Sequence, residues 1–284
     1  MIALPHDIVA RVKASRAVVF DMDGTLVLGD AASGGHRALP GAAELLSLLR
    51  RKAIPFRVFT NGTAKAPATY AASLRHAGLD VGDAEMMTPS TSAADWFVRN
   101  GIRRVRVLGL DGVQGPLREA GLDVIGPSEK AKDVEAVFTG WFREFTFPDL
   151  EAACRDIWDG ARVTTASNVP FFAALGGRAI GVSFAINAMI KSLTDQQALV
   201  LGKPARASLD CALRMMGIAE NDADQAMVVG DDPALEMRLA NSAGALSIGL
   251  TTGLATAETF ASGESEERPS AVLSSLHPLI EALS

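Results

Sequence analysis

The sequence predicts an α/β fold in which a parallel sheet is covered by helices. Strand-like and helix-like runs alternate almost throughout the chain, and this alternation is typical of parallel sheets. A chain of 284 residues can bury roughly 75% of its unfolded surface, so it needs no disulfide or structural metal to fold. The composition, with 48% hydrophobic and 21% charged residues, is that of a globular protein and excludes disorder as the main state.

The strands are predicted from short apolar runs rich in β-branched residues. In the first, residues 17–20, all four positions are apolar, which indicates a strand buried on both faces. Similar runs follow at 55–59, 105–109, 135–139, 162–165, 226–229 and 246–249.

The helices between these strands are predicted from apolar side chains at helical spacing. Pro40 opens a pattern in which Leu45, Leu46 and Leu49 share one face. Further helices are expected from Pro67 to Gly78, over 148–158, from Pro204 to Gly217, and at the C-terminus after a polar surface loop at 262–270.

Charge and cysteine usage exclude several classes of protein. The net charge of 27 − 33 = −6 gives no general attraction for nucleic acid or anionic lipid. Cys154 and Cys211 form no CxxC pair and no zinc-ligand spacing with histidine, which favours a reducing, cytoplasmic location. The most apolar stretch, residues 179–190, is about half a membrane span, and the first 16 residues do not resemble a signal peptide. We therefore expect no membrane and no nucleic-acid partner.

The first chemical motif is Asp-Met-Asp-Gly-Thr-Leu at residues 21–26, directly after the first strand. In open α/β sheets, ligands bind at the carboxyl ends of the strands. Asp21 and Asp23 can both face that edge because strand side chains alternate with period two, and Gly24 lets the backbone turn away. The pair could serve as a nucleophile and a nearby acid or base.

A calcium loop and a plain turn are the other interpretations of this hexapeptide. A calcium loop requires glycine at its sixth position and glutamate at its twelfth, where this chain has Leu26 and Ala32. A plain Asp-Gly turn is compatible with these six residues alone. The remaining motifs therefore decide between a turn and an active site.

Two weaker motifs follow. Thr60, Asn61 and Gly62 come at the end of the second strand, where a hydroxyl, an amide and a glycine can bind phosphate oxygens. Lys203 lies in Gly-Lys-Pro before a helix. This is not a P-loop, because Gln197 and Pro204 occupy positions that need glycine and Ser or Thr. Either motif alone is also compatible with an ordinary loop or a solvated lysine.

The fourth motif is Gly-Asp-Asp-Pro at residues 230–233, followed by Glu236. Adjacent acids after a buried strand are costly unless they bind a cation or hydrogen-bond donors. They suit Mg²⁺, which takes one or two carboxylates and keeps several waters. Asp232 could instead cap the helix that Pro233 starts, which would leave Asp231 without a role.

Taken in order, the four motifs resemble the haloacid dehalogenase-like (HAD) superfamily of hydrolases over nearly the whole chain. The 39 residues from Asp21 to Thr60 hold little more than one helix, whereas the 143 residues from Thr60 to Lys203 need a separate α/β cap. This cap position, with the segments at 107–112 and 249–253, resembles class IIA, the group of nitrophenylphosphatases, pyridoxal phosphatases and NagD-like phosphatases. The resemblance implies a Rossmann-like core at 1–101 and 197–284 and an inserted C2-type cap at 102–196.

The resemblance also implies a role for each motif residue. Asp21 would attack phosphorus to form an aspartyl phosphate, and Asp23 would protonate the leaving oxygen and then activate water. Thr60, Asn61, Gly62 and Lys203 would bind the phosphate. Asp21, the carbonyl of Asp23 and Asp231 would ligate Mg²⁺, with Asp232 and Glu236 behind them. The implied substrate is a small phosphorylated metabolite.

The chain departs from its relatives in the cap and behind the metal. Glu236 stands where many class IIA members have aspartate. The segments at 140–143 and 166–169 differ from common Gly-x-Asp-Arg and Thr-Asn-x-Asp patterns. Asn168 and Arg178 are the cap residues that we expect to contact substrate, with Trp141, Phe142 and Arg143 as further candidates. A homo-oligomer formed through the cap is left open.

Three alternatives to a phosphatase use the same fold. A dehalogenase needs no second aspartate, so Asp23 argues against that branch of the superfamily. A phosphotransferase or mutase would use the same residues and differ only in the acceptor. A catalytically silent phosphate-binding protein is disfavoured because the chain retains the motif residues of all four segments.

Overall fold

The computed structural model describes residues 4–30, 35–174 and 177–284. The chain divides into two compact units. Unit 1 comprises Met1–Thr60, Ala68–Met87 and Leu209–Ser284, and unit 2 comprises Asn61–Pro67 and Thr88–Ser208. The insertion predicted at 102–196 lies within unit 2, which also takes in α4 (Pro89–Arg99) and β12 (Leu199–Val200); its limits as a domain remain a prediction.

Unit 1 is built on a six-stranded parallel sheet in the order β15-β14-β13-β1-β4-β5. Its strands are β1 (Ala17–Phe20), β4 (Phe56–Phe59), β5 (Met86–Met87), β13 (Ala226–Gly230), β14 (Leu246–Leu250) and β15 (Ala271–Leu273). A separate antiparallel hairpin joins β2 (Val27–Asp30) to β3 (Gly35–Ala38).

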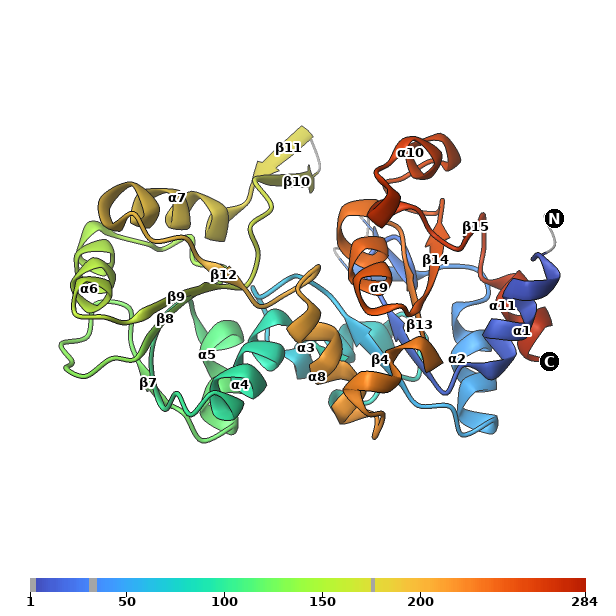
Figure 1. Cartoon of the computed structure of the whole chain (residues 1–284), viewed down its shortest axis with the longest axis horizontal. Helices are drawn as coiled ribbons and strands as arrows, with labels where there is room; N and C mark the ends of the chain where they lie inside the picture. The colour runs from blue at the N-terminus through green and yellow to red at the C-terminus, as the bar shows by residue number, and fades with distance from the viewer. Residues whose placement is uncertain (1–3, 31–34, 175–176) are drawn as a thin grey trace. The chain divides into compact units, whose positions relative to one another are not determined.

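Helices cover both faces of this sheet. They are α1 (His6–Ala14), α2 (Ala42–Arg51), α3 (Pro67–His76), α8 (Arg206–Met215), α9 (Arg238–Ala243), α10 (Ala257–Ser262) and α11 (His277–Leu283), with short turns η1 (Asp83–Glu85), η2 (Glu220–Gln225), η3 (Pro233–Met237) and η4 (Ser265–Glu267). Alternate strand residues supply the two cores: Val18 and Phe20 pack with α1, α2, α3 and α11, whereas Ala17 and Val19 pack with α8 and α9. The first and last helices, α1 and α11, lie side by side (Figure 1).

Unit 2 is a second α/β layer structure with a five-stranded parallel sheet in the order β12-β9-β8-β6-β7. Its strands are β6 (Arg104–Leu108), β7 (Asp123–Ile125), β8 (Ala136–Thr139), β9 (Arg162–Thr165) and β12 (Leu199–Val200), and an antiparallel hairpin joins β10 (Phe171–Ala174) to β11 (Gly177–Ile180). One face packs against α4 (Pro89–Arg99) and α5 (Asp111–Glu119), and the other against α6 (Phe147–Trp158) and α7 (Val182–Thr194).

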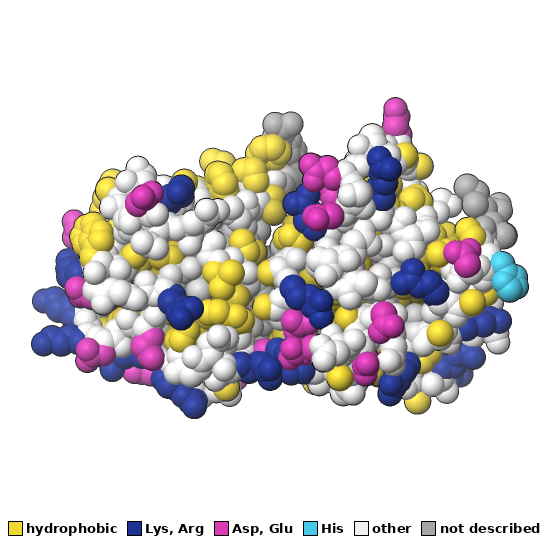
Figure 2. Space-filling view, in the orientation of Figure 1, with side chains coloured by type: hydrophobic (Ala, Val, Ile, Leu, Met, Phe, Trp, Pro, Cys, Tyr) yellow, Lys and Arg dark blue, Asp and Glu magenta, His cyan; other side chains and the backbone are white. Residues whose placement is uncertain are grey.

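The predicted α/β class is confirmed, and the seven predicted strands lie within one residue of observed strands. The apolar stretch at 179–190 forms the end of β11 and most of α7. Among the described residues, no helix is both long and apolar enough to cross a membrane. On the face that Figure 2 shows, acidic and basic side chains are interspersed, and apolar side chains gather at the β10–β11 hairpin, where Phe171, Phe172 and Ile180 are exposed.

Candidate active site

Two of the predicted site carboxylates lie at the same edge of the unit 1 sheet. β1 and β13 are neighbouring parallel strands paired with Phe20 opposite Val229, so Asp21 and Asp231 both come directly after a strand end. Asp21 is 8% exposed and Asp231 is 4% exposed. The amide of Asp21 donates to the carbonyl of Val229 at 2.9 Å, which continues the strand pairing up to the site.

Backbone from two loops encloses the carboxylate of Asp231. A Cβ atom on Gly24 would lie 2.3 Å from Asp231 Oδ2, and one on Gly253 would lie 1.8 Å from it. The amide of Leu254 donates to the same oxygen at 2.8 Å, and the Thr252 hydroxyl donates to the carbonyl of Gly24 at 2.5 Å. These backbone contacts fix the position of Oδ2 and so restrict the orientation of the Asp231 carboxylate.

Asp23 is placed differently from Asp21. The chain turns at Gly24, which has a φ of +85°. The amide of Gly24 donates to the carbonyl of Val27 at 2.8 Å. The side chain of Asp23 is 55% exposed, and its Oδ1 lies 3.3 Å from Nε2 of His36 on β3. Its carboxyl group is therefore accessible to solvent, as an acid or base that meets a leaving group and then water must be.

The residues that follow β13 contact one another closely. Asp232 accepts a hydrogen bond from the amide of Ala234 at 2.8 Å, so it caps the segment that Pro233 starts, as one interpretation of the sequence predicts. Glu236, 1% exposed, accepts from the amide of Asp232 at 3.0 Å. A Cβ on Gly230 would lie 2.2 Å from Cγ of Glu236, so only glycine fits at the end of this strand. The proposed support of the metal by Asp232 and Glu236 remains a prediction.

Unit 2 joins two motifs that are 142 residues apart in the sequence. Asn61 Oδ1 accepts from the amide of Lys203 at 2.9 Å, and Asn61 Nδ2 donates to the carbonyl of Lys203 at 3.0 Å. Lys203 is 2% exposed, and Gly202 before it meets the carbonyl of Ala166 so closely that an added Cβ would lie 2.3 Å away. The Thr-Asn and Gly-Lys-Pro motifs are therefore held together by the Asn61 side chain.

The remaining predicted residues are placed as follows. Thr60, 7% exposed, follows β4 and its amide donates to the carbonyl of Met87 at 3.2 Å. Gly62 follows Asn61 in the loop between β4 and α3. Asn168 is exposed and lines a cavity of about 160 Å³ with Phe184, Asn187, Lys191 and others from the same unit. The backbone of Arg178 pairs with Ala173 in the β10–β11 hairpin, and its side chain lies outside the described structure.

The donor set fits a hard divalent cation. Across 4–30, 35–174 and 177–284, no three His, Cys, Asp or Glu side chains lie together so that they could hold a metal. Asp21 and Asp231 supply two buried carboxylates at the β1–β13 edge, and a metal held there would combine them with backbone carbonyl and water oxygens. That combination suits Mg²⁺, and a cation would offset the cost of two buried carboxylates at adjacent strand ends.

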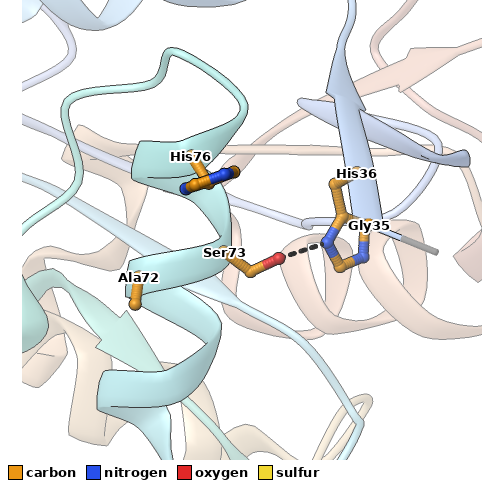
Figure 3. Close-up of a pocket in the computed structure, with 5 residues that line it drawn as sticks. All are labelled: Gly35, His36, Ala72, Ser73 and His76. Atoms are coloured by element: carbon orange, nitrogen blue, oxygen red, sulfur yellow. Dashed lines mark hydrogen bonds between the residues drawn. The ribbon is translucent and has the colours of Figure 1, made fainter. Parts of the chain in front are cut away.

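Sequence reasoning missed His36 and Ser73. His36 Nδ1 lies 2.8 Å from the Ser73 hydroxyl of α3, and both line a cavity of about 350 Å³ together with Gly35, Ala72 and His76 (Figure 3). The sequence predicted little more than one helix between Asp21 and Thr60, but the β2–β3 hairpin is also present. Its strands contain polar residues and form no continuous apolar run, which is the pattern that predicted the other strands.

Family models match two stretches of the chain. A haloacid dehalogenase-like hydrolase model matches residues 18–123, and a HAD-hydrolase-like model matches residues 200–279. Human chronophin is 29% identical over 288 residues, covering 95% of this chain and 93% of chronophin. The chain therefore belongs to the haloacid dehalogenase-like hydrolases and, within them, to the class IIA phosphatases.

Solved structures agree with this assignment. A 4-nitrophenylphosphatase from Thermotoga maritima has a TM-score of 0.84 and 25% identity, with 96% of this chain and 99% of that one covered. A glycerol phosphate phosphatase from Mycobacterium tuberculosis, in complex with magnesium, has a TM-score of 0.80 and 24% identity, with 95% and 77% covered. The second likeness supports the fold, which is that of a sheet core with an inserted α/β cap.

Proposed function

We propose that this protein is a Mg²⁺-dependent phosphatase that hydrolyses small phosphomonoesters through an aspartyl phosphate on Asp21. The observation that carries the proposal is the pair of buried carboxylates, Asp21 and Asp231, at the ends of adjacent strands β1 and β13. The family membership and the phosphatases among its relatives support the reaction class. The proposed substrate is a small phosphorylated metabolite.

In the first half of the proposed reaction, a carboxylate oxygen of Asp21 attacks phosphorus. The bond from phosphorus to the ester oxygen breaks, and Asp23 gives that oxygen its proton, so an alcohol leaves. In the second half, Asp23 takes a proton from water as the water oxygen attacks phosphorus, and the bond to Asp21 breaks. The sum is one ester and one water converted to one alcohol and one phosphate, with both aspartates restored.

The remaining motif residues would stabilise charge on the transferring group. We propose that the Lys203 ammonium and the Thr60 hydroxyl bind phosphate oxygens, with Asn61 fixing the backbone on either side of Lys203. Asp21, the carbonyl of Asp23 and Asp231 would hold Mg²⁺. The bound cation would neutralise charge on the phosphoryl oxygens, which is the main requirement of phosphoryl transfer.

The insertion at 102–196 would select the substrate. The core motifs recognise a phosphate and a metal but contain no group suited to a particular leaving group. We propose that Asn168 and Arg178 contact the leaving group; in support, Asn168 is exposed and lines a cavity of about 160 Å³. Substitution of Asn168 should change KM and the ranking of substrates while leaving turnover of p-nitrophenyl phosphate nearly intact. A uniform loss on every substrate would contradict this role.

The proposal is tested with purified protein and p-nitrophenyl phosphate. The wild type should release phosphate with Mg²⁺ and stop when the metal is chelated. Asp21→Asn should abolish turnover and form no phosphoenzyme, because its amide is a poor nucleophile. A phosphoenzyme mapped to any residue other than Asp21 would contradict the assignment. Phosphate found on a second alcohol rather than in solution would indicate a transferase, and silence across a phosphomonoester panel would indicate a binding protein.

A further inference from the structure

The β2–β3 hairpin is anchored beside the candidate acid/base. Val27, the first residue of β2, forms an isolated bridge with Asp23, and its amide donates to the carbonyl of Met22 at 3.1 Å. In the hairpin, Val27 pairs with Ala38 and Gly29 pairs with His36. Backbone pairing therefore holds His36 of β3 at a fixed distance from the turn that carries Asp23.

The imidazole of His36 lies between a carboxylate and a hydroxyl. Its Nε2 is 3.3 Å from Asp23 Oδ1, which is long for a hydrogen bond, and its Nδ1 is 2.8 Å from Ser73 Oγ. Figure 3 shows the ring directed from β3 towards α3, where Ser73 meets it. The side chain of His36 is 15% exposed, so its orientation is restricted by its surroundings.

This arrangement favours one tautomer of a neutral imidazole. An ionised carboxylate only accepts hydrogen bonds, so the proton of the ring belongs on Nε2 when that nitrogen faces Asp23. Nδ1 is then an acceptor, and the Ser73 hydroxyl can donate to it. Ser73 therefore favours the tautomer whose N–H is directed at Asp23.

We propose that His36, oriented by Ser73, is a positioning residue for the Asp23 carboxyl group; this rests on the acid/base role proposed for Asp23. An aspartate side chain that is 55% exposed would otherwise sample several rotamers. A contact from Nε2 to Oδ1 restrains the carboxyl group and leaves Oδ2 to carry the transferred proton. The catalytic benefit is geometric, because the acid must lie within reach of the leaving oxygen.

A structural role for His36 is the competing explanation, and leaving-group dependence separates the two. A misplaced acid matters most for leaving groups that need protonation and least for nitrophenolate. The ratio kcat/KM reports the steps up to departure of the alcohol, so it is measured for a series from p-nitrophenyl phosphate to phenyl phosphate. A purely structural defect lowers kcat/KM for all members of the series alike.

The variants are His36→Phe, which keeps a ring without nitrogen, and His36→Gln, which keeps an N–H donor. For His36→Phe we expect kcat/KM to fall at least tenfold with phenyl phosphate and less than threefold with p-nitrophenyl phosphate. His36→Gln should recover part of the loss, and Ser73→Ala should show a smaller loss of the same pattern. His76→Phe, which changes another imidazole lining the same cavity, is the control and should leave the series unchanged. Melting temperatures establish that each variant is folded.

A double-mutant cycle completes the test. In an Asp23→Asn background, His36→Phe should cause no further loss, because the carboxyl group that it positions is gone. Equal losses for good and poor leaving groups, or a full additional loss in the Asp23→Asn background, would overturn the inference. If wild-type protein released no phosphate, or if Asp21→Asn remained active, the proposed function itself would be refuted and the inference with it.

Discussion

The amide of Leu254 donates a 2.8 Å hydrogen bond to Oδ2 of Asp231, which lies 23 residues earlier in the chain. The loop after β14 thereby fixes a carboxylate that follows β13. Gly253, next to Leu254, approaches the same oxygen so closely that an added Cβ would lie 1.8 Å away. Loop and carboxylate must therefore be positioned together.

Gly253→Ala should weaken metal binding without unfolding the protein. The new methyl group would displace the Asp231 carboxylate or the loop, and either movement disturbs a proposed metal ligand. We expect the Mg²⁺ concentration for half-maximal activity to rise at least tenfold, measured by titration with p-nitrophenyl phosphate as substrate. Gly29→Ala is the matched control, because a Cβ there meets nothing within 4 Å. An unchanged Mg²⁺ requirement in Gly253→Ala would argue against Asp231 as a ligand.

Glu236 offers a second test of the segment after β13. Its Oε2 accepts from the amide of Asp232 at 3.0 Å in a site where Glu236 is 1% exposed. Glu236→Ala should leave that amide without its acceptor and lower the free energy of unfolding by about 1–3 kcal/mol. Glu236→Gln, which retains an acceptor oxygen, should lose less. Urea titration measures the free energy of unfolding of both variants. Equal losses of stability would show that this hydrogen bond does not contribute to it.

The sequence predicted the main features of the fold because parallel strands buried on both faces are continuous apolar runs. The strands at 17–20 and 162–165 match the observed limits, and α6 begins one residue before the predicted start at 148. Short or partly exposed elements were missed. The strands β5 and β12 contain only two residues each, and polar residues in β2 and β3 interrupt any apolar run.

The candidate site was predictable where chemistry and strand ends coincide, as at Asp21 and Asp231. Contacts made by backbone atoms were not predictable, because almost every residue type has a backbone amide that could take the place of that of Leu254. His36 was missed for a different reason. Its significance comes from its distance to Asp23 and Ser73, which depends on a hairpin that the sequence pattern did not reveal.

A buried ion pair in unit 2 should govern the stability of that unit. Arg106, 1% exposed, donates through Nε to Asp156 at 2.5 Å and through Nη1 to the carbonyls of Gly126, Pro127 and Glu129. Asp156→Asn would leave the guanidinium without its counter-charge, and breaking such a pair costs about 3–5 kcal/mol.

Urea unfolding should detect this loss, and the exposed Asp159→Asn change on the same segment should have little effect. A chain with two compact units can unfold in more than one step. The unfolding transition is therefore measured both by spectroscopy and by loss of activity. The Mg²⁺ requirement of folded Asp156→Asn should match that of the wild type. A stability equal to that of the wild type would show that the pair contributes nothing net.

Glu135 predicts a pH dependence that is separate from catalysis. Its carboxylate accepts from the amide of Arg103 at 2.7 Å and from the amide of Arg104 at 2.8 Å, and these hydrogen bonds lower the pKa of Glu135. A group whose pKa is lowered on folding stabilises the protein above its unfolded pKa, about 4.3 for glutamate. That stabilisation is lost as the pH falls through the lower pKa of the folded state.

Glu135→Gln should therefore melt below the wild type at pH 7, with a difference that shrinks below about pH 4. The exposed Glu151→Gln on α6 is the control, measured in the same thermal series. A Glu135→Gln difference that stays constant or grows on acidification would show that the charge of Glu135 is not the source of the effect.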